Sequence, residues 1–133
     1  MIKGVTFNGI HCSKVHLAML DSRRPLLAET KDTYIDIPFK SGSILVPDNS
    51  KLDVMVEVDF LLKPRPNVNV YDDCRAISAW LSTLERKPLI FDDDSGYYYN
   101  AKVSGNIDTE RIVKARTFTV IFRCEPEMKV VGT

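Results

Sequence analysis

The clearest pattern in the chain is a run of alternating hydrophobic and polar residues at 52–62. Its hydrophobic positions are Leu52, Val54, Val56, Val58, Phe60 and Leu62. Side chains alternate between the two faces of a strand, so this run predicts one long strand with a buried face and a more solvated face. The prolines at Pro64 and Pro66 cannot donate ladder hydrogen bonds and mark the end of the strand.

Shorter hydrophobic runs predict further strands on both sides of this one. They lie at 15–20, 33–39, 89–91, 97–103 and 117–124. The turn-forming residues at 92–96 lie between two β-rich runs, which predicts a hairpin there. Turn-type residues at 21–25 and 41–43 separate the earlier strands.

One segment changes from a period of two to a helical period. Its hydrophobic residues recur at i, i+3, i+4 and i+7, which places them on one stripe of a helix. They are Ile77, Trp80, Leu81 and Leu84. Asp72 or Asp73 can cap its start, and Pro88 stops it. We therefore predict a single helix at about 73–86, with this stripe in the core as a lid on a sheet or sandwich edge.

The length and composition fit one globular domain that is mainly β. The chain has 133 residues, of which 44% are hydrophobic. Its 18 Lys and Arg residues balance 18 Asp and Glu residues, so no global field draws it to nucleic acid or to an anionic membrane. No apolar run approaches the roughly 20 residues of a membrane span, and the N-terminal segment lacks the apolar core of a signal peptide. We expect a soluble protein made inside a cell, with no nucleic-acid or membrane partner.

A metal site is first suggested by His11, Cys12 and His16. On a strand, residues i and i+4 lie about 13 Å apart, so Cys12 and His16 cannot share one ion. Asp92–Asp94 fail the EF-hand pattern, because Gly96 falls at position five and Val103 at position twelve. We expect a solvated hairpin tip there, and no metal or other cofactor in the protein.

Nothing in the chain predicts catalysis. It has no GxSxG, P-loop or GxGxxG motif, and both histidines lie near the N-terminus. The three cysteines, Cys12, Cys74 and Cys124, are widely spaced and are expected to be reduced and buried. We expect no catalytic residues, and we expect that the protein is not an enzyme.

Three consecutive tyrosines, Tyr97, Tyr98 and Tyr99, leave two interpretations open. Consecutive strand residues alternate faces, so at most two of the three lie together. The simpler arrangement places one in the core and the others on a wet face or a subunit interface, for which we take Tyr97 and Tyr99. The alternative is a carbohydrate-binding β-sandwich that uses these tyrosines and Trp80 to recognise a host receptor. The helical spacing of Trp80 argues against it, since this residue belongs to the buried stripe.

Four blocks of sequence follow one another in the second half of the chain. They are ISAWL at 77–81, KPLIFDD at 87–93, YYYNAKVSG at 97–105 and TVIFRCEP at 119–126. In this order they resemble the N-terminal domain of the siphophage distal tail protein family, also called phage tail component. Earlier in the chain, GVTFNG at 4–9 resembles the family's opening strand, and Arg24-Pro25 resembles its Arg-Pro pair. The family's gly-arg-x-gly turn is replaced here by FKSG at 39–42.

The resemblance implies a β-sandwich with one flanking α-helix, related to phage tail-tube folds. It implies one domain at 1–133, with the family's usual C-terminal galectin-like domain absent or cut off. Such domains form a homohexameric ring that links the tail tube to the hub or baseplate during host attachment. The implied protein is a structural part of the virion tail of a phage or prophage, made in the bacterial host cytoplasm. A tail-tube or tail-completion protein of the same broad fold is the alternative.

A ring requires that each subunit present two different, complementary surfaces. The segment 35–62 is our candidate for an arm that contacts neighbours. Within it, Ile44, Leu45 and Val46 are hydrophobic between polar turns. We expect these three residues to pack against an adjacent subunit.

Overall fold

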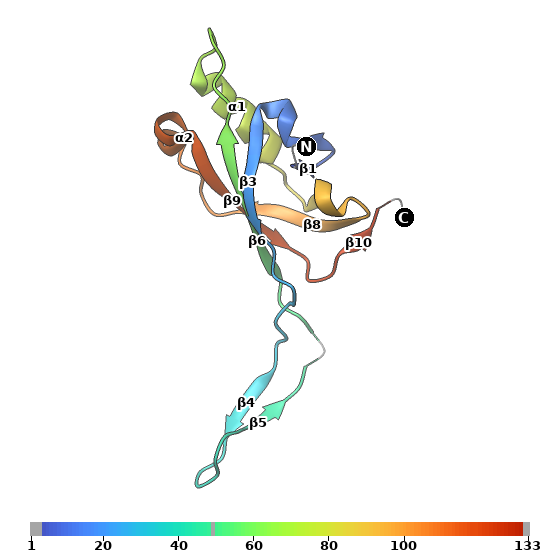
Figure 1. Cartoon of the computed structure of the whole chain (residues 1–133). Helices are drawn as coiled ribbons and strands as arrows, with labels where there is room; N and C mark the ends of the chain where they lie inside the picture. Colours follow the sequence, from blue (N-terminus) through green and yellow to red (C-terminus); the bar gives the residue numbers. More distant parts are fainter. Residues whose placement is uncertain (1–3, 49, 132–133) are drawn as a thin grey trace.

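The computed structural model describes residues 4–48 and 50–131, which form a body and a long projecting arm (Figure 1). The strands of the body are β1 (Val5–Phe7), β2 (Ile10–His11), β3 (Leu17–Arg23), β6 (Val54–Leu62), β7 (Lys87–Phe91), β8 (Tyr97–Ser104), β9 (Thr117–Cys124) and β10 (Lys129–Val130). The arm contains β4 (Thr33–Asp36) and β5 (Ser43–Val46). The helices are α1 (Val70–Leu81) and α2 (Thr109–Ala115), with short 3-10 turns η1 (Cys12–Val15) and η2 (Asp92–Asp94).

The strands of the body form one antiparallel sheet in the order β2-β1-β7-β8-β9-β6-β3, with β10 paired to β8. Phe7 on β1 and Phe122 on β9 are three places apart in this order, yet their ring centroids lie 5.1 Å apart. The sheet therefore curls so that its two halves pack face to face, as in the predicted sandwich. Strand pairing nevertheless continues without a break from one half to the other. The prediction of a mainly β fold with a flanking helix is confirmed.

The long strand predicted from the alternation is β6, at the centre of the core. Val56, Val58 and Phe60 are completely buried, and β6 pairs with β3 on one side and β9 on the other. The predicted start at Leu52 is wrong, since the strand begins at Val54 and Leu52 is 41% exposed. Leu52 instead belongs to the root of the arm, where its N–H donates to the Glu29 carbonyl at 2.7 Å.

The remaining strand predictions differ mainly at their ends. The hairpin of β7 and β8 forms as predicted, with η2 at its tip. The strand predicted at 15–20 runs from Leu17 to Arg23, because Val15 lies in η1 and a bulge between Met19 and Asp21 lets pairing with β6 continue. The turn predicted at 21–25 thus begins only after Arg23. The strand predicted at 33–39 is β4 and ends at Asp36.

The predicted helix is present as α1 but is shifted towards the N-terminus. Its N-cap is Asn69, whose side chain accepts from the Tyr71 N–H at 3.0 Å, so the prediction that Asp72 or Asp73 caps it is wrong. Ile77, Trp80 and Leu81 are buried as predicted. Leu84 was wrongly placed in the stripe: the helix ends at Leu81, and Leu84 is 95% exposed.

The prediction of a single helix is wrong, because α2 is a second one. It has seven residues, and the Asp108 side chain caps it by accepting from the Glu110 N–H at 3.0 Å. Ile112 is its one buried residue. So short a segment with one buried position has no visible helical period, although the Asp cap was a readable signal.

Trp80 joins α1 to the start of the sheet. Its indole N–H donates to the Phe7 carbonyl at 3.1 Å and to the Ile10 carbonyl at 3.0 Å. Its ring meets those of Phe7 and Phe60 edge-on, at centroid distances of 6.3 and 6.0 Å. One side chain therefore closes the end of the curled sheet.

We expect Trp80→Phe to lower the free energy of unfolding by about 1–3 kcal/mol, because two carbonyls lose a donor while most ring contacts remain. Urea denaturation followed by circular dichroism measures this. Tyr71→Phe on the exposed side of the same helix is the control and should leave the midpoint unchanged. Equal midpoints for the Trp80 variant and the parent would show that these hydrogen bonds do not stabilise the fold.

Candidate assembly surfaces

The arm, residues 24–53, leaves the body after β3 and returns to it at β6 (Figure 1). Its strands pair with Tyr34 opposite Leu45 and Ile35 opposite Ile44. Every residue of both strands is exposed. The arm is thus a two-stranded ribbon that no other described element of the chain covers.

The arm is unusually hydrophobic for an exposed ribbon. More than half of the exposed large hydrophobic residues of the described chain belong to it. They are Leu26, Leu27, Tyr34, Ile35, Ile37, Phe39, Ile44, Leu45, Val46 and Leu52. Directly opposed residues share a face, so Tyr34 with Leu45 forms one apolar face and Ile35 with Ile44 forms the other. A ribbon has no core of its own, and apolar surface on both faces is typical of a segment that another protein surface covers.

The apex of the arm presents Phe39. The ring is fully exposed, and its backbone has a φ of +66°, a conformation that few side chains adopt. Gly42 completes the turn with a φ of +77°. The turn therefore holds an aromatic side chain outward at the far end of the arm.

The root of the arm is fixed to the body through Arg24. Its guanidinium makes two hydrogen bonds to the Asp93 carboxylate, at 2.9 and 2.7 Å, and lies 4.2 Å from the centroid of the Phe91 ring. Hydrogen bonding to Asp93 raises the pKa of Arg24. Such a bidentate pair stacked on an aromatic ring restrains the direction in which the arm leaves the body.

The acidic hairpin tip is less solvated than predicted. Asp92 accepts from the Gly4 N–H at 2.8 Å and pairs with the His11 ring at 2.9 Å, while Asp93 holds Arg24. His11 therefore binds a carboxylate, Cys12 is buried, and His16 ends η1. Within residues 4–48 and 50–131, no three His, Cys, Asp or Glu side chains converge on a point where an ion could be held.

The structure separates the residues predicted for an interface. Ile44, Leu45 and Val46 lie together on β5, exposed on the arm. Tyr97 is exposed on β8 in the body, beside Val130. Tyr99 is only 8% exposed and packs edge-on against Phe91, and burial raises its pKa. Its assignment to an interface is therefore wrong, because its side of β8 turns into the core.

Arginines neutralise the carboxylates on the wetter face of β6 and its neighbours. Arg23 binds Glu57 at 2.6 Å and Asp59 at 2.9 and 3.0 Å. Asp53 binds Arg123 and Arg86, each at 2.8 Å. Hydrogen bonds from Arg23 lower the pKa of Asp59, and those from Arg123 lower the pKa of Asp53. Carboxylates held ionised in this way do not suit general acid catalysis.

These lowered pKa values predict acid sensitivity. A carboxyl group whose folded pKa lies below its unfolded value, about 3.9, adds stability above that value and loses it as the pH falls through the folded pKa. We expect the urea midpoint to change little from pH 7 to pH 5 and to fall below about pH 4. In Asp59→Asn this fall should be smaller, because the variant lacks one such carboxyl. An identical pH profile for the variant would contradict the role given to Asp59.

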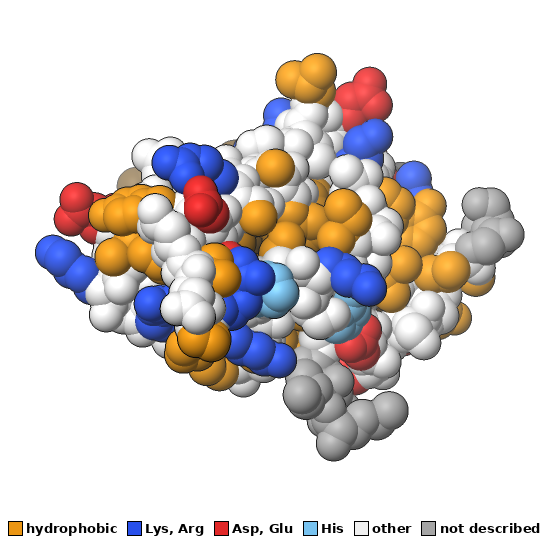
Figure 2. All heavy atoms as spheres, turned by 90° about the horizontal axis from the view of Figure 1, so that it is seen from above, with side chains coloured by type: hydrophobic (Ala, Val, Ile, Leu, Met, Phe, Trp, Pro, Cys, Tyr) orange, Lys and Arg blue, Asp and Glu red, His pale blue; other side chains and the backbone are white. Residues whose placement is uncertain are grey.

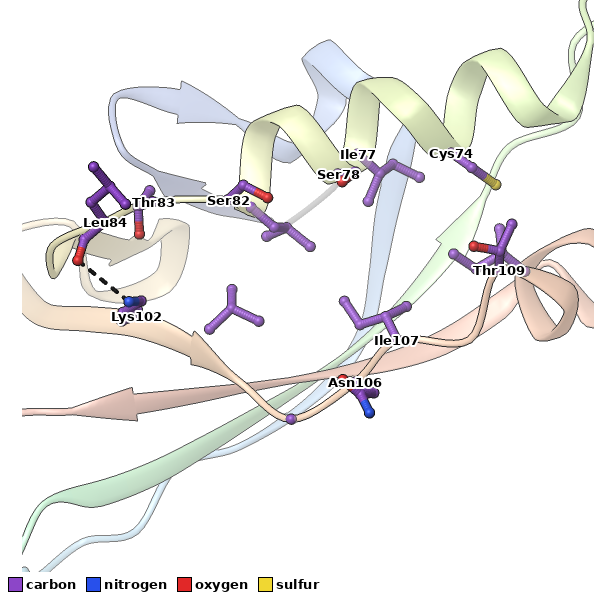
Figure 3. Close-up of a pocket in the computed structure, with 14 residues that line it drawn as sticks. Cys74, Ile77, Ser78, Ser82, Thr83, Leu84, Lys102, Asn106, Ile107 and Thr109 are labelled. Carbon is purple, nitrogen blue, oxygen red and sulfur yellow. Dashed lines mark hydrogen bonds between the residues drawn. The ribbon is translucent and has the colours of Figure 1, made fainter.

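A groove lies between α1, the segment 82–84, the end of β8 and the segment that leads to α2 (Figure 3). Its volume is about 680 Å³. Ile77, Leu81 and Ile112 line it with buried hydrophobic side chains. The amino group of Lys102 donates to the Leu84 carbonyl at its edge, at 3.3 Å. Sequence reasoning missed the groove because one of its walls depends on α2.

The end of the body opposite the arm also exposes hydrophobic side chains. Figure 2 shows them gathered across this end among scattered charged residues. α1 begins at this end, and Val68 and Tyr71 at its start are exposed. No helix in the part of the chain that the structure describes is long and apolar enough to cross a membrane. The hydrophobic surface is thus divided between the arm, the groove and this end.

The model of the phage tail protein RIFT-related domain matches residues 10–124, which is most of the chain. The chain belongs to this phage tail protein family. The match includes both the arm and the groove. It confirms the resemblance to siphophage tail proteins that the sequence motifs indicated.

A solved structure similar to this member of the phage tail family is that of the SPP1 Dit protein (gp 19.1). That protein is described as a paradigm of the hub adsorption apparatus in phages that infect Gram-positive bacteria. The TM-score is 0.79 at 13% sequence identity, which shows a shared fold. The similarity covers 98% of this chain and 53% of SPP1 Dit, so the chain spans about half the length of that protein. A comparison with curated protein sequences finds no match.

Proposed function

We propose that the protein is a structural component of a siphophage or prophage tail tip, where it forms a homohexameric ring that links the tail tube to the hub or baseplate. Membership of the phage tail family and the fold shared with SPP1 Dit support this proposal. The observation that carries it is the arm, whose two hydrophobic faces are uncovered in the single chain. In a ring, each arm is covered by the neighbouring subunit.

The arm favours a head-to-tail arrangement. It projects from one side of the body, while the groove and the end seen in Figure 2 lie elsewhere. Two different surfaces that complement each other produce a ring when the rotation closes. A stable interface buries about 800 Å² on each partner, and the exposed hydrophobic side chains of the arm contribute to such an area.

The remaining parts of the proposal follow from this scaffolding role. We place the protein in the virion tail, with tail-tube and hub or baseplate proteins as partners. The described domain acts as the ring-forming unit that the resemblance to N-terminal distal tail domains implies. We assign it no catalytic activity, since the carboxylates of Asp53, Glu57 and Asp59 are paired with arginines and its hydrophobic surfaces suit contacts with other proteins.

The carbohydrate-binding alternative used Trp80 and the three tyrosines Tyr97 to Tyr99. Trp80 is 3% exposed and its indole N–H is engaged by two backbone carbonyls, while Tyr99 is buried. The Trp80 and Tyr99 rings therefore cannot stack on a sugar in this fold, while Tyr97 is exposed. The alternative of a tail-tube or tail-completion protein of the same broad fold differs in the partners of the ring rather than in chemistry.

Light scattering coupled to size exclusion, followed by negative-stain microscopy, tests the proposal. We expect a particle of six times the chain mass and images of closed rings. Long tubes would favour a tail-tube protein. A monomer at every tested concentration would contradict assembly through the arm.

A further inference from the structure

The groove defined above is a concave, largely apolar site on the body. Leu84, almost fully exposed, stands at its edge, and Ile77, Leu81 and Ile112 lie along it. Figure 3 shows side chains from α1 and from the segment after β8 facing each other across it. Its volume of about 680 Å³ lies in the range of pockets that bury most of a bound group.

Two polar groups of the groove are without adequate partners in the described chain. The Thr83 hydroxyl is inaccessible to water and has no hydrogen-bond partner. Lys102 is the one charged residue of the lining, and its amino group meets only the Leu84 carbonyl and no carboxylate. The ammonium group of Lys102, at the edge of an apolar groove, attracts an acid.

One face of the arm has the complementary pattern. Tyr34 lies opposite Leu45 on it, and Asp36 lies opposite Ser43 one step nearer the apex. Within the described part of the chain, the Asp36 carboxylate has no ion-pair partner. This face therefore offers two large hydrophobic side chains, one unpaired acid and one hydroxyl.

The arm cannot fill the groove of its own chain. Figure 1 shows it extending away from the side of the body that carries α1 and α2. Any contact between the two must therefore join different copies, and a contact between unlike surfaces is head-to-tail.

We propose that the groove receives the Tyr34–Leu45 face of the arm of a second copy of this chain, with Asp36 paired to Lys102. This inference rests on the proposed assembly through the arm and adds the surface on which the arm docks. The opposite face, with Ile35 and Ile44, is then covered by further contacts that the assembly also needs.

Charge reversal in two separate chains tests the contact. Asp36→Lys places like charges together in its own assembly, and so does Lys102→Glu. Each variant alone should assemble at least about tenfold more weakly than the parent. An equimolar mixture should recover parental assembly, because opposite charges then meet at every contact between the two variants. The introduced lysine faces the introduced glutamate at one contact, and the native Asp36 faces the native Lys102 at the next. Both positions are exposed, so neither change disturbs the core.

The control is Lys14→Glu, the same charge change at an exposed site outside the arm and groove. It should assemble like the parent. Recovery in the mixture also shows that both variants are folded. If the mixture assembles no better than the single variants, or if the single variants assemble like the parent, the docking site is wrong. If the parent itself remains monomeric, the proposed assembly is wrong, and this outcome is distinct from failure of the docking site alone.

Cys74 provides a second readout that leaves the sequence unchanged. It lines the groove and is partly exposed, while Cys12 and Cys124 are buried. Burial raises the pKa of the Cys74 thiol, so alkylation with iodoacetamide is best followed at about pH 8.5. Mass spectrometry should find Cys74 alkylated at least about tenfold more slowly in assembled protein than in dilute monomer. Equal rates, or protection of the monomer by another occupant, would overturn the inference.

Discussion

Replacing Ile35 and Ile44 together with threonine is expected to leave the subunit folded and to prevent its assembly at micromolar concentration. The two residues are directly opposed on one face of the arm and make no contact with the core. Threonine keeps the β-branched shape that strands favour, so the ribbon should persist. The lost burial amounts to about 3 kcal/mol for the pair, or on the order of hundredfold in the association constant.

The matched control for this pair is Leu20→Thr with Val130→Thr. Both residues are exposed to a similar degree, but they lie on the body. Sedimentation velocity over a concentration series compares the parent with both double variants. If the arm variant assembled as well as the parent, the Ile35–Ile44 face of the arm would not be a contact between subunits.

Phe60→Ala should be the most destabilising of the substitutions considered, at about 3–5 kcal/mol. Phe60 is completely buried at the centre of β6, with its ring 6.0 Å from that of Trp80 and 5.8 Å from that of Phe118. Its removal leaves a cavity where the helix, β6 and β9 meet. We expect a lower urea midpoint with an unchanged slope, measured by tryptophan fluorescence.

Phe39→Ala is the control for this prediction, because it is the same chemical change at the apex of the arm. Phe39 is fully exposed, so its removal should leave the free energy of unfolding within about 0.5 kcal/mol of the parent. A similar loss of stability in the two variants would show that the arm folds back onto the body in solution.

Secondary structure was predicted most accurately where a sequence pattern is compatible with only one kind of element. The alternation in β6 is long, and a shift of one residue would turn every buried side chain to solvent, so the strand could be placed closely. The helix was placed too far along because Leu84 fits the helical period although the chain has already left the helix. Asn69 was an equally good cap three residues before Asp72, and local propensity does not decide between them.

The arm was only partly predictable. Ile44, Leu45 and Val46 were predicted to pack against an adjacent subunit; they are exposed in the single chain, and their contact with a neighbour stays a prediction. The alternation at 33–39 predicted a strand, but period alone does not show whether a hairpin packs on its own domain or projects from it. The signal was the hydrophobic residues on both faces. The groove forms where α1, β8 and α2 come together in space, and a local sequence pattern does not show such tertiary contacts.

In the proposed assembly, the link between Arg24 and Asp93 bears on how fast subunits join. A ribbon that swung freely at its root would lose much conformational entropy on docking, and many encounters would end without productive contact. Because the root is held on the Phe91 ring by two charge-assisted hydrogen bonds, the arm is already pointed before a neighbour arrives. Preorganisation of this kind raises the fraction of collisions between subunits that lead to docking. The association rate then depends more on how often subunits collide than on how long the arm takes to reorient.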